Sequence, residues 1–183
     1  MGEDMDYLLE INDVLSRLKE VRRTGWVERG VEDPESVADH SFNVVALSII
    51  LADARGLDVA EVARMAILHD LPEAVIGDLT PSQKREKLSE LGRIEDEIIK
   101  SLAGSMPREV GDKYLQAWRK LVEGRSPEAK LVRLVDKLEM GLQATRYIKK
   151  GGDNKLLEIY YSGIDSVKED PCLLEILKKA LER

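Results

Sequence analysis

The two histidines of the chain lie in sequence surroundings that suit metal binding. His40 directly follows Asp39, and His69 is followed by Asp70 after the apolar residues 65–68. A histidine in an apolar helix wall is most often a hydrogen-bonded core residue. The adjacent aspartate favours another interpretation, because a buried carboxylate without a positive partner is strongly unfavourable. A metal ion would supply the positive charge at this place.

Asp136 is a further candidate ligand, far downstream of the histidines. The segment 126–150 shows the helical period, and its charged side chains form one solvent-facing stripe: Lys130, Arg133 and Lys137. Asp136 lies off that stripe, on the line of Val132 and Met140. A salt bridge to a neighbouring helix is the alternative explanation for a carboxylate in this position.

The elements that carry these residues are predicted to be helices. Almost every segment has apolar residues at the helical spacing, and none has a sustained period of two. Ser36 and Asp39 form a capping box that predicts a helix through about Arg55, ended by Gly56. Other caps and stops predict helices over residues 8–21, 58–70, 90–102, 107–121 and 126–150, and helices that begin near residues 80 and 170. We expect one all-α domain over residues 1–183, with roughly six to nine helices.

Composition restricts the classes of partner. The chain has 28 Lys and Arg against 35 Asp and Glu, a net charge of −7, which argues against binding to polymeric nucleic acid. A small anionic substrate stays compatible with this balance. The longest apolar stretch, residues 44–52, is much shorter than the ~20 residues of a membrane span, so no membrane association is expected. The single Cys172 cannot form an internal disulfide, which favours a reducing, cytoplasmic location.

The order His40, His69 and Asp70, then Asp136 resembles the HD-domain superfamily of metal-dependent phosphohydrolases. Longer strings narrow the resemblance to the 5′-deoxynucleotidase branch of that superfamily. They are Arg-Thr-Gly-Trp-Val at 23–27, Pro-Glu-Ser-Val-Ala-Asp-His at 34–40 and His-Asp-Leu-Pro-Glu-Ala-Val-Ile-Gly-Asp at 69–78. The similarity extends over nearly the whole chain, including residues 126–132 and the segment around Asp136.

The resemblance implies a compact helical HD-domain bundle with one metal site in its core cleft. One divalent cation per subunit would be held by His40, His69, Asp70 and Asp136. Two imidazoles and two carboxylates suit Mn, Fe, Co, Ni or Zn. The lack of a nearby cysteine argues against a closed structural zinc site, and the chain has no further histidines for a second ion. Relatives also suggest a homodimer.

Two carboxylates after the metal-binding pair, Glu73 and Asp78, match residues that serve catalysis in the resembled branch. Pro72 and Gly77 predict a turn that projects them into a cleft. Glu73 is the candidate for handling the proton of the nucleophile or leaving group, and Asp78 for orienting water or protonating the departing 5′ oxygen. The sequence does not divide these roles. A loop of solvated acids is the alternative.

Arg23 and Trp26 are the candidate substrate-binding residues. The resembled branch has an Arg-Trp dipeptide near this place, whereas here Trp26 stands three residues after Arg23. The guanidinium would clamp a phosphate and the indole would pack on the nucleoside, although core packing is the simpler role for Trp26. Trp118 and Tyr114 are expected in the core or an interface, and the charged run at residues 84–87 on a solvated face.

The function implied is hydrolysis of deoxyribonucleoside 5′-monophosphates to deoxyribonucleoside and inorganic phosphate. One alternative is another HD phosphohydrolase that acts on a nucleoside triphosphate, a cyclic nucleotide or an alarmone. The other is a helical nucleotide-binding module without turnover. The presence of every proposed ligand favours an enzyme. The native metal and the base preference cannot be determined from the sequence.

Overall fold

The computed structural model describes residues 5–86 and 88–183. It is 76% helical, and within those residues the only extended pairing is an isolated bridge between Arg22 and Ser36. The helices are α1 (Tyr7–Leu18), α2 (Thr24–Val27), α3 (Val37–Arg55), α4 (Val59–Leu68), α5 (Glu73–Ile76), α6 (Pro81–Glu86), α7 (Leu88–Ser105), α8 (Arg108–Glu123), α9 (Pro127–Lys149), α10 (Leu156–Val167) and α11 (Pro171–Glu182). The expected all-α class is confirmed.

Side-chain caps fix the ends of the helices that carry the candidate ligands. The Ser36 hydroxyl accepts the Asp39 N–H at 3.1 Å, and the Asp39 carboxylate accepts the Ser36 N–H at 2.9 Å, so α3 begins with the predicted capping box. Gly56, with φ of 66°, ends the same helix. Ser126 caps α9 by accepting the N–H of Ala129 at 3.1 Å. These local signals set the register of both helices.

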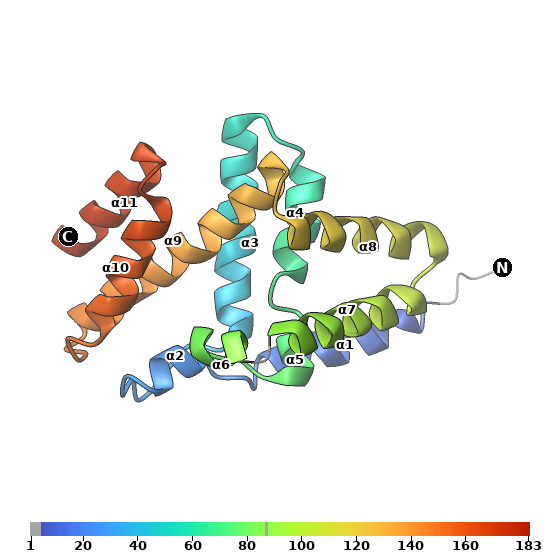
Figure 1. Ribbon diagram of the computed structural model, residues 1–183, viewed down its shortest axis with the longest axis horizontal. Coiled ribbons are helices and arrows are strands. Elements are labelled where there is room, and N and C mark those ends of the chain that lie inside the picture. Colours follow the sequence, from blue (N-terminus) through green and yellow to red (C-terminus); the bar gives the residue numbers. More distant parts are fainter. Residues whose placement is uncertain (1–4, 87) are drawn as a thin grey trace.

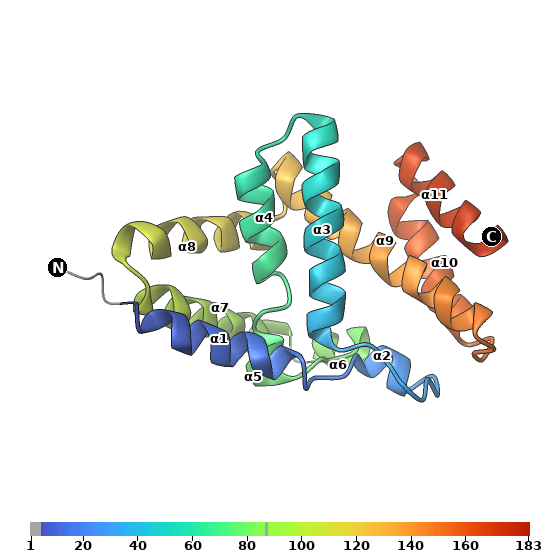
Figure 2. The same cartoon turned by 180° about the vertical axis from the view of Figure 1, so that it is seen from behind.

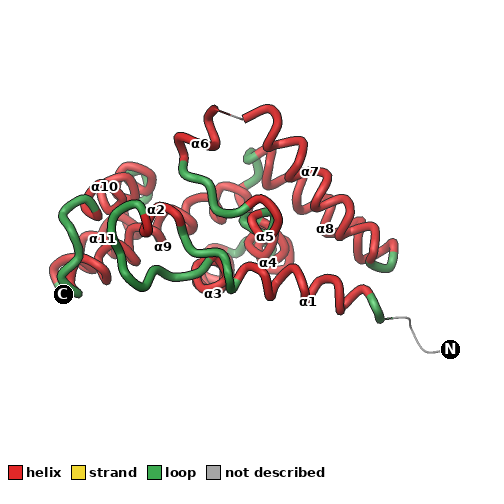
Figure 3. The backbone as a smooth tube through the Cα atoms, turned by 90° about the horizontal axis from the view of Figure 1, so that it is seen from below, coloured by secondary structure: helices red, strands yellow, loops and turns green. Residues whose placement is uncertain are grey.

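The long helices α3 and α9 form the centre of the molecule (Figure 1). The helices α3, α4 and α9 pack against one another. The helices α1, α7 and α8 lie at one end and α10 and α11 at the other, an arrangement that is also seen from behind (Figure 2). From below, α6 lies at the margin of the molecule, next to the start of α7 (Figure 3). The central helices thus position most of the candidate site.

Two hydrophobic clusters share α9. The first contains Trp118, Val135 and the buried faces of α3, α4 and α8, with Tyr114 packed against it, as expected for the two aromatic residues. The second contains Leu138 and joins α9 to α10 and α11. Asp136 therefore lies where the two clusters meet, between Val135 and Leu138.

The structure has eleven helices in its described part, more than the six to nine expected. The stretch 22–34, expected to be irregular, contains the four-residue α2. The helices α2 and α5 have four residues each, which is too short for a periodic pattern, whereas α6 begins at Pro81, where a helix was predicted. The helix α10 was not predicted, and its N-cap residue Lys155 makes no side-chain cap. Two residues earlier, the Asp153 carboxylate accepts the Lys155 N–H at 2.8 Å, a start signal that the sequence analysis did not use.

By length and composition, α3 is the one helix in the described ranges that could cross a membrane. The apolar stretch at residues 44–52 is thus part of a longer helix of 19 residues. In the structure, α3 packs against α4 and α9, and Val44, Ser48 and Ala52 are buried on its inner side. Packing in the core accounts for the apolar side chains of Val44 and Ala52.

Candidate metal centre

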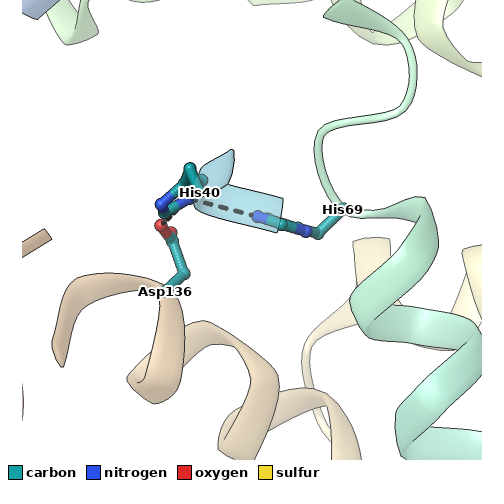
Figure 4. Close-up of side chains that lie close together, drawn as sticks. All are labelled: His40, His69 and Asp136. Atoms are coloured by element: carbon teal, nitrogen blue, oxygen red, sulfur yellow. Dashed lines mark hydrogen bonds and ion pairs between the residues drawn. The ribbon is translucent and has the colours of Figure 1, made fainter. Parts of the chain in front are cut away.

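Three of the predicted ligands converge from three elements (Figure 4). His40 lies in the first turn of α3, His69 directly follows α4, and Asp136 lies in the middle of α9. The Nε2 atoms of the two histidines are 3.4 Å apart. Asp136 Oδ1 is 3.3 Å from His40 Nε2. The three side chains are close enough to hold one ion together.

Asp70 completes the predicted set of four. Its Oδ2 lies 3.3 Å from His69 Nε2 and 3.5 Å from His40 Nε2. Atoms that share one ion at about 2.1 Å are separated by distances of this size. The structure thus brings together every residue that the sequence analysis singled out as a metal ligand.

The Nδ1 atoms of both histidines are occupied on the side away from this cluster. His40 Nδ1 lies 2.7 Å from Glu139 Oε2, and His69 Nδ1 lies 2.8 Å from the carbonyl oxygen of Ala66. Both partners only accept hydrogen bonds, so each Nδ1 carries the proton and each neutral ring has its lone pair on Nε2. Two lone pairs and two carboxylates that face one another require a shared positive group. The chemistry of these donor atoms fits a divalent cation.

When no metal ion is bound, a proton on His40 supplies part of this positive charge. Burial and Arg23 lower the pKa of His40, but Asp136, Glu139 and Asp70 outweigh them and raise it to about 10. Burial favours the neutral form of Asp136, yet the hydrogen bond with His40 and the charge of Lys137 hold its pKa below the ordinary value. A metal ion bound at His40 Nε2 would have to displace this proton, so its binding would become tighter as pH rises.

Glu73 is buried beside the proposed ligands. Its Oε1 accepts a hydrogen bond from Lys84 Nζ at 2.9 Å. Its Oε2 is 3.7 Å from Arg23 Nη1 and has no hydrogen-bond partner among the described residues. Burial and the charges of Asp70 and Asp78 raise the pKa of Glu73 to about 8, although Lys84 and Arg23 oppose the rise. This carboxyl can hold or release a proton near neutral pH.

Asp78 holds the segment that carries Arg23. It accepts hydrogen bonds from Arg23 Nη1 at 3.0 Å and from the Thr24 N–H at 2.5 Å. The Thr24 hydroxyl in turn donates to the Asp78 carbonyl at 2.7 Å. Gly77, with φ of 83°, makes the turn between Glu73 and Asp78. Both predicted catalytic carboxylates are thus near the ligands, in different environments.

Arg23 is buried among carboxylates. Besides its contact with Asp78, its Nη1 lies 3.3 Å from Asp70 Oδ2. Burial alone would lower its pKa, but Asp70, Asp78 and Glu73 raise it above the ordinary value. The guanidinium is therefore always charged and stands next to a proposed metal ligand.

Trp26 belongs mainly to the core. Its side chain is 1% exposed and meets Tyr147 edge-to-face at 5.3 Å between ring centroids. Its indole N–H donates to Glu35 Oε1 at 2.9 Å, which leaves the ring little surface for a nucleoside. Trp26 still contributes to the lining of the cleft described below. The structure supports the simpler, packing role for this residue.

Glu35 is a buried acid behind His40. Burial and the charge of Glu139 raise its pKa to about 7, against the hydrogen bond from Trp26. The folded protein therefore keeps a proton on Glu35 between about pH 4.5 and 7, where the unfolded chain has released it. The contribution of this residue to stability consequently falls as pH rises through that window.

We expect Glu35→Gln to raise the free energy of unfolding at pH 8 by about 1–3 kcal/mol, and to leave it nearly unchanged at pH 4.5. The glutamine keeps an acceptor for Trp26 and carries no charge to be buried. Urea unfolding of chelated protein at several pH values measures the difference, with exposed Glu32→Gln as the control. A gain independent of pH would contradict the explanation.

A cleft of about 330 Å³ opens beside the ligands. Asp70 and Asp136 are part of its wall. The basic side chains along it are Arg23, Lys84, Arg85 and Lys137, and the larger apolar ones are Trp26, Leu79, Met140 and Ile159. A smaller cavity of about 200 Å³ reaches His69, Asp70 and Asp136 as well. The cleft thus offers positive charge for a phosphate and apolar surface for a flat ring.

Sequence reasoning missed three residues of this site. Lys84 was expected on a solvated face; its side chain is 40% exposed, but its Nζ donates a hydrogen bond to Glu73. Glu35 was not singled out, although it belongs to the string at 34–40. Glu139 follows Asp136 by three residues, the spacing that puts two side chains on one helix face, so that spacing was an available signal.

The sequence matches a protein family and several known proteins. The HD domain family matches residues 15–172. A 5′-deoxynucleotidase of Dictyostelium discoideum is 35% identical over 153 residues, which cover 80% of this chain and 80% of that protein. A 5′-deoxynucleotidase of Homo sapiens is 35% identical over 146 residues, 80% of this chain and 71% of the human protein.

The fold has solved counterparts. The crystal structure of a Pyrococcus horikoshii protein superimposes with a TM-score of 0.74 at 36% identity, over 94% of this chain and 98% of that one. A conserved protein of Pyrococcus furiosus gives a TM-score of 0.75 at 29% identity, over 98% and 100%. Both similarities extend across the helices that carry the four converging side chains.

Proposed function

Since the chain belongs to the HD-domain family of metal-dependent phosphohydrolases, we propose that it removes the 5′-phosphate of deoxyribonucleoside monophosphates. The products are the deoxyribonucleoside and inorganic phosphate. Curated relatives that share 30–35% of their residues with most of this chain are 5′-deoxynucleotidases. We infer the same activity for this protein because its metal-binding and cleft residues suit that reaction.

One observation carries the proposal: Asp70 and Asp136, which contact His40 and His69, lie in the wall of a cleft that also contains Arg23 and Lys84. A phosphate placed in that cleft would find positive charge on several sides. Glu73, a buried carboxyl able to exchange a proton, lies within the same group of contacts. Metal ligands, phosphate-binding cations and a proton carrier are the parts that phosphoester hydrolysis requires.

One divalent ion per subunit would be held by His40, His69, Asp70 and Asp136. Mixed imidazole and carboxylate ligands suit Mn, Fe, Co, Ni or Zn. When bound, such an ion lowers the pKa of a water molecule and stabilises negative charge on a phosphoryl oxygen. With His40 and His69 as the only histidines of the chain, the proposal contains a single ion.

Glu73 would carry the proton of the reaction. Hydrolysis forms a bond between phosphorus and a water oxygen and breaks the bond between phosphorus and the 5′ oxygen. A proton therefore leaves the water, and a proton reaches the departing oxygen. The free Oε2 of Glu73 suits this transfer, while Lys84 holds Oε1 in place. Asp78 is already bound to Arg23 and Thr24, so we assign it the orienting role.

Arg23 would bind the phosphate group and Lys84 would add charge. Arg23 lines the cleft, and its contacts with Asp70 and Asp78 fix its position before substrate arrives. A preformed site loses less conformational entropy on binding than a mobile one. These cations interact with the phosphate and carry no information on the base.

We expect the sugar to matter more than the base in substrate choice. The apolar lining of the cleft, Leu79, Met140 and Ile159, offers no hydrogen bond to a ribose 2′-hydroxyl or to base edges. A buried hydroxyl without a partner costs roughly 1–3 kcal/mol, so kcat/KM for a deoxyribonucleotide should exceed that for the ribonucleotide by about fivefold to 150-fold. Exchange of the base should change kcat/KM by less.

A phosphate-release screen tests this prediction. Chelated protein, reloaded with each metal in turn, is given ribo- and deoxyribonucleoside mono-, di- and triphosphates, and 3′-monophosphates as controls. Equal rates on ribonucleotides or on 3′-monophosphates would indicate a broader phosphatase. Faster hydrolysis of triphosphates than of monophosphates would place the protein among triphosphohydrolases.

We also propose a cytoplasmic homodimer. Phe42 and Ile50, which are 73% and 64% exposed, form apolar surface on α3 that a second copy would cover. The exposed free Cys172 agrees with a reducing compartment. Light scattering after gel filtration measures the mass of the assembly.

A further inference from the structure

We infer that Glu139 is a positioning residue for the metal centre, which fixes His40 with its Nε2 lone pair directed at the other ligands. The inference rests on the proposed function, because it assumes that His40 binds a metal ion. It adds a residue that makes no contact with substrate and lies on the far side of the imidazole ring.

The contact between Glu139 and His40 is short and buried. Oε2 of Glu139 lies 2.7 Å from His40 Nδ1, and the two residues are 2% and 0% exposed. An ionised carboxylate only accepts hydrogen bonds, so Nδ1 must be the donor. A neutral imidazole has one N–H, and the lone pair is then on Nε2. His40 Nε2 is the atom that faces Asp70, His69 and Asp136.

A second hydrogen bond fixes Glu139 itself. Its Oε1 accepts the Asn43 Nδ2–H at 3.0 Å. His40 and Asn43 lie one turn apart on α3, and Asp136 and Glu139 lie one turn apart on α9. The two helices are thus joined by two parallel hydrogen bonds next to the ligands. Both oxygens of Glu139 point to the helix that carries His40, so its position determines the position of that ring.

The burial of Glu139 indicates that its carboxylate has a specific function, because a buried charge has a high energetic cost. A carboxylate in a helix core is strongly unfavourable unless hydrogen bonds and charges compensate it. Here the compensating groups are Asn43 and the ring that faces the metal ligands. When a metal-binding histidine donates its other ring N–H to a carboxylate, this hydrogen bond raises the basicity of the ring and orients it, and its loss typically weakens metal binding 10–100-fold.

Zinc affinity is the measurement that tests the inference, with a chromophoric chelator as competitor. We expect Glu139→Ala to bind Zn²⁺ about 100-fold more weakly than wild type, and Glu139→Gln about 10-fold more weakly, because the amide oxygen keeps the acceptor without the charge. Glu128→Gln, on the same helix but away from the ligands, is the matched control and should bind as wild type does.

Two further readouts separate positioning from simple packing. In zinc-loaded wild type and Glu139→Gln, ¹⁵N spectra of the His40 ring should show an Nδ1–H that exchanges slowly with solvent because it is hydrogen-bonded; in zinc-loaded Glu139→Ala this proton should exchange rapidly. Urea unfolding of each chelated variant checks that it is folded under the conditions of the affinity measurement. If Glu139→Ala does not fold, the zinc affinity of Glu139→Gln tests the inference.

The possible results are distinguishable. A loss of less than threefold in Glu139→Gln, or of less than tenfold in a folded Glu139→Ala, would overturn the inference and leave the proposed function intact. Wild-type protein that binds no zinc would contradict the proposed metal centre itself.

Discussion

Replacement of His69 or Asp70 by alanine is expected to abolish stoichiometric metal binding and phosphate release together. His69 Nε2 and Asp70 Oδ2 both lie within 3.5 Å of His40 Nε2. Each variant therefore removes one of the four proposed metal ligands. Loss of the ion removes several kcal/mol of charge stabilisation in the transition state, which corresponds to about a thousandfold or more in rate.

Metal content after loading and gel filtration, measured by elemental analysis, checks this prediction alongside the rate of phosphate release. The exposed Asp53→Ala on α3 is the control and should keep both metal and activity. Wild-type protein should also gain about 4 kcal/mol of unfolding free energy at a thousandfold excess of metal over its Kd, a gain that the variants lack. Full metal occupancy in His69→Ala or Asp70→Ala would count decisively against the assigned ligands.

Glu73→Gln is expected to keep metal and substrate binding and to lose at least about a hundredfold in kcat. The glutamine has nearly the same shape and can still accept from Lys84, but it cannot take up or release a proton. Because burial and Asp70 already raise the pKa of Glu73 to about 8, a neutral side chain is tolerated there and the fold should be unaffected.

Steady-state kinetics with a deoxyribonucleoside monophosphate separates kcat from KM for this variant. Binding of the same nucleotide, measured by calorimetry, should stay within a few-fold of wild type. Glu97→Gln, an exposed exchange on α7, is the control for the loss of one negative charge. A kcat near that of wild type would remove Glu73 from the proton transfer.

The convergence of the four proposed metal ligands was predictable from the sequence, because the surroundings of these residues carry local signals. His69 and Asp70 follow an apolar helix, and Asp136 lies off the charged stripe of α9. The capping box at Ser36 also fixed the register of α3, so His40 could be placed on its inner face. In these cases the position of a side chain follows from helix geometry and from the cost of burying charge.

The residues that hold or surround these ligands depend on contacts between elements. Lys84 contacts Glu73 from the next helix, across the irregular segment at residues 77–80, and no periodic pattern encodes the course of that segment. Glu35 lies in an irregular segment, and the course of that segment brings its carboxyl to the Trp26 N–H and near the charge of Glu139. Likewise, the role of Trp26 was left open because its burial depends on Tyr147, more than a hundred residues downstream.

Titration of activity against metal equivalents tests the central claim most directly. Chelated protein is mixed with increasing amounts of one divalent metal, and phosphate release from deoxyadenosine 5′-monophosphate is followed at saturating substrate. A single ion held by His40, His69, Asp70 and Asp136 predicts no activity without metal, a linear rise, and a plateau at one equivalent per chain. Turnover by the chelated protein, or a plateau that requires two equivalents, would contradict the one-metal phosphohydrolase proposed for this fold.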